Sequence, residues 1–242
     1  MKIIISPSKN QNRPNQLIQP EILNFNKTVN LFKTIKNLKT NELQTLFKIK
    51  DNLLEEVEQL YHGFNVSNHT SQAIEIYSGV VFEQIKHDEY NQFQTKYLNE
   101  NLIILSAMYG VLKPRTFIWP YRLDFTIKPN KINLYHYWQE DIENFFDKEE
   151  LIINLASNEF SKLLTKHQEH IININFFEEQ KDKSLKVISY NAKKARGIMV
   201  NELILNLVKD INQIKEFNID GYIFSQEQSD DKNFCFIKKY NK

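Results

Sequence analysis

The sequence has little cysteine, little glycine and no long apolar run. Its single cysteine, Cys235, cannot form a disulfide within the chain, and we expect it to be a small core residue in a reducing compartment. The five glycines form none of the common glycine-rich phosphate or nucleophile motifs. No apolar run approaches the roughly 18 residues of a membrane span, and no leader-like segment opens the sequence. These absences predict a cytoplasmic protein without a membrane anchor.

Metal-ligand patterns are also scarce. Of the six histidines, only His167 and His170 have the spacing of two ligands on a helix, and no cysteine or carboxylate arrangement completes them. We therefore expect neither a metal site nor a cofactor.

The composition that is present is that of a globular protein, with 41% apolar and 25% charged residues. Apolar runs predict strands over 2–5, 102–105, 151–155, 171–177 and 185–188, with a closing hairpin over 222–225 and 233–238. Helical periodicity predicts helices over 22–38, 41–49, 53–61, 80–85, 90–98, 134–146, 159–164 and 199–211. Residues 72–77 fit either a strand or a helix. We expect a mixed α/β fold over residues 1–242, a single domain with one central sheet and a helical insert near 22–64.

Four of the predicted strands end in a polar loop that contains a serine. The four serines are Ser6, Ser106, Ser157 and Ser189. Ligands of open α/β sheets bind beyond the carboxyl ends of the strands, so four neighbouring strands of the same direction would place these loops along one crevice. Alternatively, each serine caps the helix that follows it.

The stretch 189–197 combines basic residues with a predicted helix start. Asn191 is the expected N-cap, and Lys193, Arg196 and Gly197 fall on the same face as the apolar stripe of the helix that follows. Cations in the first turns of a helix are disfavoured by its dipole. A bound anion would relieve this conflict, because the helix N-terminus and the basic side chains all favour negative charge.

Basic residues gather in windows that contain no acid, namely 1–20, 101–123 and 183–201, although the net charge is only +1. This distribution predicts a basic cleft on an otherwise acidic body, which favours a polyanionic partner. The residues expected to bind DNA or another anion are Lys9, Lys113, Arg115, Arg122, Lys193, Lys194 and Arg196. The residues expected to line the cleft are Ser6, Ser106, Tyr109, Tyr121, Ser157 and Glu159.

Several short motifs together resemble one family. They are ISPSK at 5–9, SAMYGVLKPR at 106–115, WPYRL at 119–123, LYHYW at 134–138, INLASNE at 153–159, AKKARG at 192–197 and FNIDGY at 217–222. Spread in order along the chain, they are similar to the YaaA family of bacterial peroxide stress proteins. The resemblance implies a compact fold of the cantaloupe type with a helix-hairpin-helix-like element at about 40–61. It also implies DNA binding in a positively charged cleft, and protection when hydrogen peroxide meets intracellular iron.

The sequence departs from this family's pattern at the hairpin. Residues 48–52 lack the two glycines whose neighbouring backbone N–H groups usually hold a phosphate, and Glu55, Glu56 and Glu58 would repel DNA. Ser8 and Ala107 stand where the family more often has alanine and glycine. Contact between DNA and the hairpin, through Lys48 and Lys50, and an ordinary structural role for it both stay open.

Two functional hypotheses follow. The first is a DNA-binding stress protein whose contacts are mainly to phosphates, with weak sequence preference. The second is an enzyme acting on a small phosphorylated or nucleotide-like ligand, or on DNA, in the same cleft. Candidates for its acid–base chemistry are Lys9, Ser6, Tyr109 and Glu159, but no nucleophile–base pair or reaction can be assigned. The oligomeric state is equally open.

Overall fold

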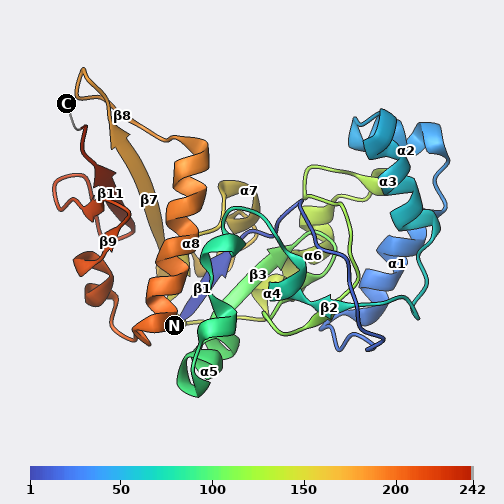
Figure 1. Cartoon of the computed structure of the whole chain (residues 1–242), viewed down its shortest axis with the longest axis horizontal. Helices are drawn as coiled ribbons and strands as arrows, with labels where there is room; N and C mark the ends of the chain where they lie inside the picture. Colours follow the sequence, from blue (N-terminus) through green and yellow to red (C-terminus); the bar gives the residue numbers. More distant parts are fainter. Residues whose placement is uncertain (241–242) are drawn as a thin grey trace.

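The strand β1 (Lys2–Ile5) lies inside a mixed sheet in the computed structural model, which describes residues 1–240 (Figure 1). Its residues Ile3, Ile4 and Ile5 are completely buried. β1 pairs in parallel with β3 (Leu102–Ser106) on one side and with β6 (Ile152–Asn154) on the other. An unbroken apolar run is the pattern of a strand that is covered on both faces, which explains why these runs were recognisable in the sequence.

Within residues 1–240, nine strands form this sheet, and its middle is parallel. The order is β4 (Gly110–Leu112), β3, β1, β6, β7 (Ile171–Glu179), β11 (Asn233–Lys238), β10 (Tyr222–Phe224) and β9 (Asn218–Ile219), with β8 (Leu185–Lys186) paired to β7. Strands β3 to β11 in this order are parallel, and the outer pairings are antiparallel. The predicted hairpin of β10 and β11 is confirmed.

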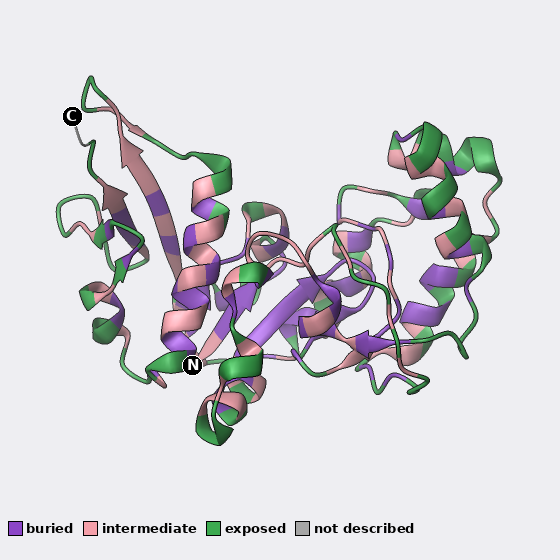
Figure 2. Cartoon of the chain, viewed as in Figure 1, coloured by how far each residue is buried: buried purple, intermediate pink, exposed green. Residues whose placement is uncertain are grey.

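Helices cover the sheet and extend the molecule at one end. The helices are α1 (Phe25–Lys36), α2 (Thr40–Phe47), α3 (Asp51–His62), α4 (Ala73–Ile76), α5 (Gln92–Asn101), α6 (Leu134–Glu143), α7 (Asn158–Ser161) and α8 (Ser189–Leu205). Figure 1 places α1 to α3 at the end opposite β9 and β11, and Figure 2 shows that α2 exposes most of its residues whereas β1 and β3 are buried. The predicted mixed α/β class and the helical insert are confirmed.

Short elements fill the remaining connections. Residues 72–77, ambiguous in the sequence, contain the end of β2 (Ser71–Gln72) and the single turn of α4. β2 pairs with β5 (Phe117–Ile118) in a separate two-stranded sheet. The single-turn 3-10 helices are η1 (Phe82–Gln84), η2 (His87–Glu89) and η3 (Pro129–Lys131), and the longer ones are η4 (Thr165–His170) and η5 (Ile211–Glu216). The helix expected over 80–85 is thus only η1.

The expected boundaries of α8 were wrong. The helix begins at Ser189, and Asn191 is not its N-cap but lies inside the first turn, where its amide donates a 2.7 Å hydrogen bond to the Glu178 carboxylate. It ends at Leu205 and not near 211, because the chain turns at Leu207, whose φ of 49° is left-handed. The apolar stripe is confirmed over the helix itself, where Val200, Leu203 and Ile204 are buried, but its expected continuation to 211 lies beyond the helix end.

The expectation of a buried strand over 185–188 was also wrong. Only Leu185 and Lys186 pair, antiparallel to the end of β7, while Val187 and Ile188 are 55% and 38% exposed. β8 folds back along the end of β7 (Figure 1). A short apolar run does not by itself tell whether a second layer will cover it.

The helix expected over 41–49 begins one residue earlier, at Thr40. Lys39 is the N-cap of α2, and its backbone N–H donates to the Glu42 carboxylate in a 2.7 Å hydrogen bond. This is half of a capping box, in which the acidic third residue satisfies the first free N–H group.

Candidate functional site

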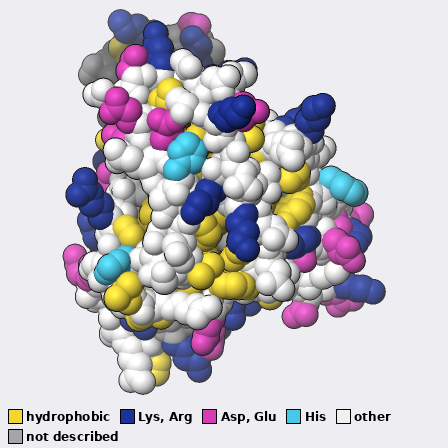
Figure 3. Space-filling view, turned by 90° about the vertical axis from the view of Figure 1, so that its right-hand side faces the viewer, with side chains coloured by type: hydrophobic (Ala, Val, Ile, Leu, Met, Phe, Trp, Pro, Cys, Tyr) yellow, Lys and Arg dark blue, Asp and Glu magenta, His cyan; other side chains and the backbone are white. Residues whose placement is uncertain are grey.

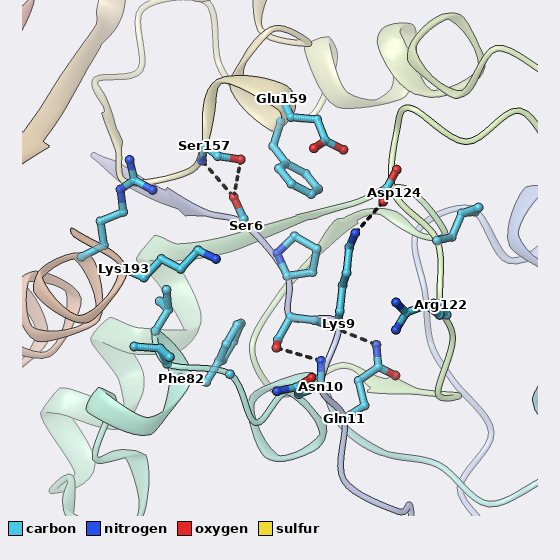
Figure 4. Close-up of a pocket in the computed structure, with 18 of the residues that line it drawn as sticks. Ser6, Lys9, Asn10, Gln11, Phe82, Arg122, Asp124, Ser157, Glu159 and Lys193 are labelled. Carbon is cyan, nitrogen blue, oxygen red and sulfur yellow. Dashed lines mark hydrogen bonds and ion pairs between the residues drawn. The ribbon is translucent and has the colours of Figure 1, made fainter. Parts of the chain in front are cut away.

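A cavity of about 340 Å³ opens beyond the carboxyl ends of β1 and β6 (Figure 4). Five segments far apart in the sequence form it: residues 6–11, 79–82, 121–124, 155–160 and the face of α8 that carries Lys193 and Arg196. Parallel neighbouring strands end at the same edge of the sheet, which is why the loops after β1 and β6 meet there. The position agrees with the usual place of ligands in open α/β sheets.

The cavity brings together eight of the thirteen residues that the sequence nominated. They are Ser6, Lys9, Tyr121, Arg122, Ser157, Glu159, Lys193 and Arg196. The other five, Ser106, Tyr109, Lys113, Arg115 and Lys194, do not line it.

Three basic residues outside the cavity have separate surroundings. Lys194 forms a 3.1 Å ion pair with Asp220. Lys113 and Arg115 are exposed, and the Arg115 Nε donates to the Gln72 side chain at 3.2 Å. Contact between these three residues and DNA, on a surface outside the cavity, stays a prediction.

Of the four serine loops, three follow neighbouring parallel strands as expected, but only two of these serines reach the cavity. Ser106, the last residue of β3, is completely buried. The fourth strand, β8, runs antiparallel to β7, so the condition that all four strands share one direction is not met. Ser189 begins α8, and this helix still contributes two cations to the cavity.

α8 reaches the cavity because Gly197 allows it to pack closely against residues 79–84. A Cβ atom at this position would lie 2.3 Å from the Val81 carbonyl oxygen and 2.9 Å from the Gln84 Cβ atom. No other residue type fits this contact without displacing the helix. The glycine therefore fixes the position of Lys193 and Arg196.

Lys193 and Arg196 form a positively charged end of the cavity. Within residues 1–240, neither has a carboxylate oxygen within 4.0 Å of its charged nitrogens. The Arg196 Nε is buried and has no hydrogen-bond partner among these residues, and burial lowers the pKa of the guanidinium. An uncompensated, partly buried cation is costly unless a bound anion pairs with it.

Ser6 and Ser157 join the two strand-end loops beside these cations. The Ser157 backbone N–H donates to the Ser6 Oγ at 2.9 Å, and the Ser6 hydroxyl donates to the Ser157 Oγ at 3.3 Å. Since a hydroxyl also carries one donor hydrogen, the Ser157 hydroxyl remains free to donate into the cavity. Figure 4 shows Lys193 extending toward this pair.

The other end of the cavity contains carboxylates as well as cations. The Lys9 Nζ lies 2.9 Å from the Asp124 carboxylate. Burial opposes ionisation of Asp124, but hydrogen bonds from Thr126 and Lys9 outweigh it and hold the pKa below its ordinary value. Burial raises the pKa of Glu159, and the negative charge of the nearby Asp124 raises it further. The Glu159 carboxylate accepts a 3.1 Å hydrogen bond from the Phe125 N–H.

A buried hydrogen-bond network supports the wall behind the cavity. The Tyr121 hydroxyl lies 2.8 Å from the Ser106 Oγ and 2.9 Å from the Tyr77 hydroxyl. Burial raises the pKa of Tyr121 to about 12, so this phenol is neutral near pH 7. Tyr109 lies deeper and donates to the Trp119 carbonyl oxygen at 2.7 Å. Ser106 and Tyr109 thus support the site from the core.

Sequence reasoning missed Asp124, Gln11 and the segment 79–82. Asp124 directly follows the basic window that ends at residue 123, and it therefore falls outside any window chosen for its lack of acids. Gln11 accepts a 2.9 Å hydrogen bond from the Tyr121 N–H, but nothing in the sequence distinguishes it from its polar neighbours. The segment 79–82 meets α8 only in the folded chain.

A second cavity of about 410 Å³ adjoins the first. The two share Lys9, Asn10, Gln11, Tyr121 and Arg122, and the second extends to Leu53, Glu56, Val57 and Leu60 on α3. The helical hairpin therefore borders the hollow through α3, and the residues it contributes there include an acid. Lys48 and Lys50 are exposed and outside this lining.

The side of the molecule formed by the α1–α3 end shows charges of both signs. In Figure 3, Lys and Arg side chains are interspersed with Asp and Glu around apolar patches.

Two kinds of feature are absent from the described part of the chain. Residues 1–240 contain no group of three or more His, Cys, Asp or Glu side chains placed to hold a metal ion. Across the same residues, no helix is both long and apolar enough to span a membrane.

Comparison with known proteins identifies the family of the chain. The family model described as "Peroxide stress protein YaaA" matches residues 1–228. The chain belongs to this family. Its relatives include UPF0246 proteins of Fusobacterium nucleatum, 36% identical over 99% of both chains, and of Finegoldia magna, 37% identical over 98% of both. A UPF0246 protein of Malacoplasma penetrans is 37% identical over 99% of this chain and 100% of its own length.

The resemblance inferred from seven short motifs is thereby confirmed. Membership of the YaaA family connects the chain with peroxide stress, as the family's description states. DNA binding and protection against iron are not part of that description.

Proposed function

We propose that this YaaA-family protein acts in peroxide defence by binding DNA through its phosphates, with one phosphate held in the cavity beside β1 and β6. The observation that carries the proposal is the convergence of Lys9, Arg122, Lys193 and Arg196 on one cavity. Three of these cations, Arg122, Lys193 and Arg196, have no carboxylate oxygen within 4.0 Å of their charged nitrogens within residues 1–240. A phosphate that pairs with Lys193 and Arg196 would offset the cost of holding the partly buried Arg196 guanidinium without a partner.

DNA is the anion that we favour because the hollow continues past the first cavity. The adjoining cavity gives a strand room to leave the phosphate site toward α3. Contacts made mainly to phosphates give affinity without reading bases, so we expect weak sequence preference. Lys113 and Arg115 would extend the contact of a longer DNA, and the protein would act in the cytoplasm, with its DNA.

We expect the protective role in peroxide stress to follow from the binding of the protein along DNA. Bound protein would limit strand cleavage by ferrous iron and hydrogen peroxide because it covers the backbone. A plasmid-nicking assay tests this role: wild-type protein should reduce nicking, and the variant Lys193→Ala/Arg196→Ala should not. Equal protection by both proteins would show that protection does not depend on the cavity.

The salt dependence of DNA binding tests the proposed function. The slope of log affinity against log salt should become shallower by about one unit for each phosphate that Lys193→Ala or Arg196→Ala no longer binds. Lys194→Ala is the matched control, because Lys194 lies next to Lys193 in the chain but pairs with Asp220 outside the cavity. A salt-independent affinity, or a double variant that binds like wild type, would disprove the proposal.

A second candidate is an enzyme that acts on a small phosphorylated or nucleotide-like ligand. It is favoured by the cavity size, within the roughly 300–1,000 Å³ of small-molecule sites, and by Glu159, whose raised pKa suits acid–base chemistry. Thermal unfolding with nucleotides and sugar phosphates distinguishes the two candidates. A stabilising small ligand that competes with DNA, and is converted to product, would favour the enzyme.

A further inference from the structure

The cavity has two ends with different charge. Lys193 lies on one side with Ser6 and Ser157, while Asp124 and Arg122 lie on the other and Lys9 extends between them (Figure 4). The ion pair between Lys9 and Asp124 neutralises two of the charges. The remaining charges at that end are Arg122 and Glu159, of opposite sign. Net positive charge therefore concentrates at the Lys193 end.

The charge at the Lys193 end matches one terminal phosphate. Two uncompensated cations, Lys193 and Arg196, face that end. A phosphomonoester carries about −1.5 to −2 at pH 7, whereas a phosphodiester within a strand carries −1. The monoester also has three terminal oxygens, and this end offers donors for them from the lysine ammonium, the buried Arg196 Nε and the Ser157 hydroxyl.

The space available leads to the same ligand. A cavity of about 340 Å³ is near the lower limit of small-molecule pockets, so it suits a strand terminus better than a double helix passing through. Apolar side chains including Phe82, Leu155 and Phe160 line it between the polar groups. Such a lining suits the carbon framework of a sugar or base next to a phosphate.

We propose that the cavity recognises the terminal phosphomonoester of a DNA strand, held by Lys193, Arg196 and Ser157, in preference to internal phosphodiesters. This inference rests on the proposed function and narrows its ligand to phosphorylated strand ends. The first nucleoside lies toward the electrically balanced end, where Lys9, Asp124 and Glu159 offer both donors and acceptors.

Binding of matched oligonucleotides tests the inference. Single-stranded oligonucleotides of one sequence, with an internal fluorophore and either hydroxyl ends, a 5′-phosphate or a 3′-phosphate, are titrated with the protein and followed by anisotropy. One of the phosphorylated forms should bind roughly tenfold to hundredfold more tightly than the hydroxyl form, the range expected for a charge-assisted contact. Lys193→Ala should abolish this preference, and Lys194→Ala should retain it.

The outcomes separate the two proposals. Equal affinity of the three oligonucleotides, with binding still dependent on Lys193 and Arg196, would overturn terminal recognition and leave the proposed function intact. Binding that depends on neither residue would overturn both. A preference for the phosphorylated end that survives Lys193→Ala would overturn the assigned site. Because Lys193 is exposed, its replacement leaves the packing of the core unchanged, so the test does not depend on how well an Arg196 variant folds.

Discussion

Lys193 and Arg196 lie three residues apart on α8, so both project toward the same cavity. The sequence indicated these two cations because they share a face with the apolar stripe of the helix. Lys9 and Arg122, which were chosen from the basic windows, line the same cavity, and their contact with an anion stays a prediction. Lys113 and Arg115 follow β4 on the antiparallel edge, and no spacing along a loop tells which side of a sheet it reaches.

The pH dependence of stability tests the environment of Glu159. Its raised pKa means that burial favours the protonated form in the folded protein. This contribution to stability is complete below the ordinary value of 4.5 and is lost as the pH rises through the folded-state pKa. Glu159→Gln keeps the side chain neutral, so its free energy of unfolding should increase relative to wild type as the pH rises through this range.

Urea unfolding at a series of pH values measures this difference. The exposed Glu149→Gln, outside the cavity lining, is the control. Parallel stability profiles for wild type and Glu159→Gln would contradict the assigned environment.

Ser106 is predicted to stabilise the wall of the cavity although it does not line it. Its Oγ accepts hydrogen bonds from the N–H groups of Met108 and Tyr109, each at 3.2 Å. Ser106→Ala leaves both buried donors unsatisfied, and we expect a loss of about 2–4 kcal/mol in the free energy of unfolding. Tyr121→Phe removes one hydroxyl from the same network and should cost less, about 1 kcal/mol. Chemical unfolding that ranks the two variants in the opposite order would disprove this role.

At the scale of elements, buried strands were the most predictable features. β1, β3 and β6 are continuous apolar runs between polar loops, and all three were located from the sequence within a residue or two. α8 was not, because its first residues lack a side-chain cap and its start depends on contacts with β7. The exposed residues after β8 have the same apolar composition as a core strand, and only the tertiary structure distinguishes them.

Gly197→Ala tests how α8 positions the cations. The new methyl group would overlap the Val81 carbonyl oxygen, since 2.3 Å is far shorter than a normal contact. Overpacking of this kind costs about 1–3 kcal/mol, and the helix must move away from residues 79–84 to relieve it. We expect a lower melting temperature together with weaker binding of phosphate-bearing ligands.

Leu205→Ala is the control within the same helix. Leu205 is 41% exposed, and its replacement should change stability by no more than about 0.5 kcal/mol. A Gly197→Ala variant with unchanged melting temperature and unchanged binding would show that close packing at this point does not position the site.

At the scale of the whole molecule, the net charge of +1 conceals the arrangement that matters. Parts of the three sequence stretches without acids lie together in the fold. The loop after β1, the loop at 121–124 and α8 meet at one cavity. Their combination also includes Asp124 and Glu159, so the site is positive at one end and balanced at the other. The hollow thus changes charge along its length, and the basic cleft expected from the windows stays a prediction.

The helical hairpin shows what a family resemblance adds and what it leaves open. Its two helices were located in the sequence, and α3 borders the adjoining cavity through Leu53, Glu56, Val57 and Leu60. In the turn between these helices, Lys48 and Asp51 adopt left-handed φ angles of 52° and 55°. The turn therefore keeps a glycine-like backbone with side chains that glycine lacks, and contact of Lys48 with DNA stays a prediction.

A crystal structure of the protein with a 5′- or 3′-phosphorylated oligonucleotide tests the central claim most directly. We predict a phosphate at the α8 end of the cavity, within hydrogen-bond distance of Lys193, Arg196 and Ser157, with the strand leaving toward α3. A complex in which the phosphates contact other surfaces, while the side chains of Lys193 and Arg196 bind none, would contradict it.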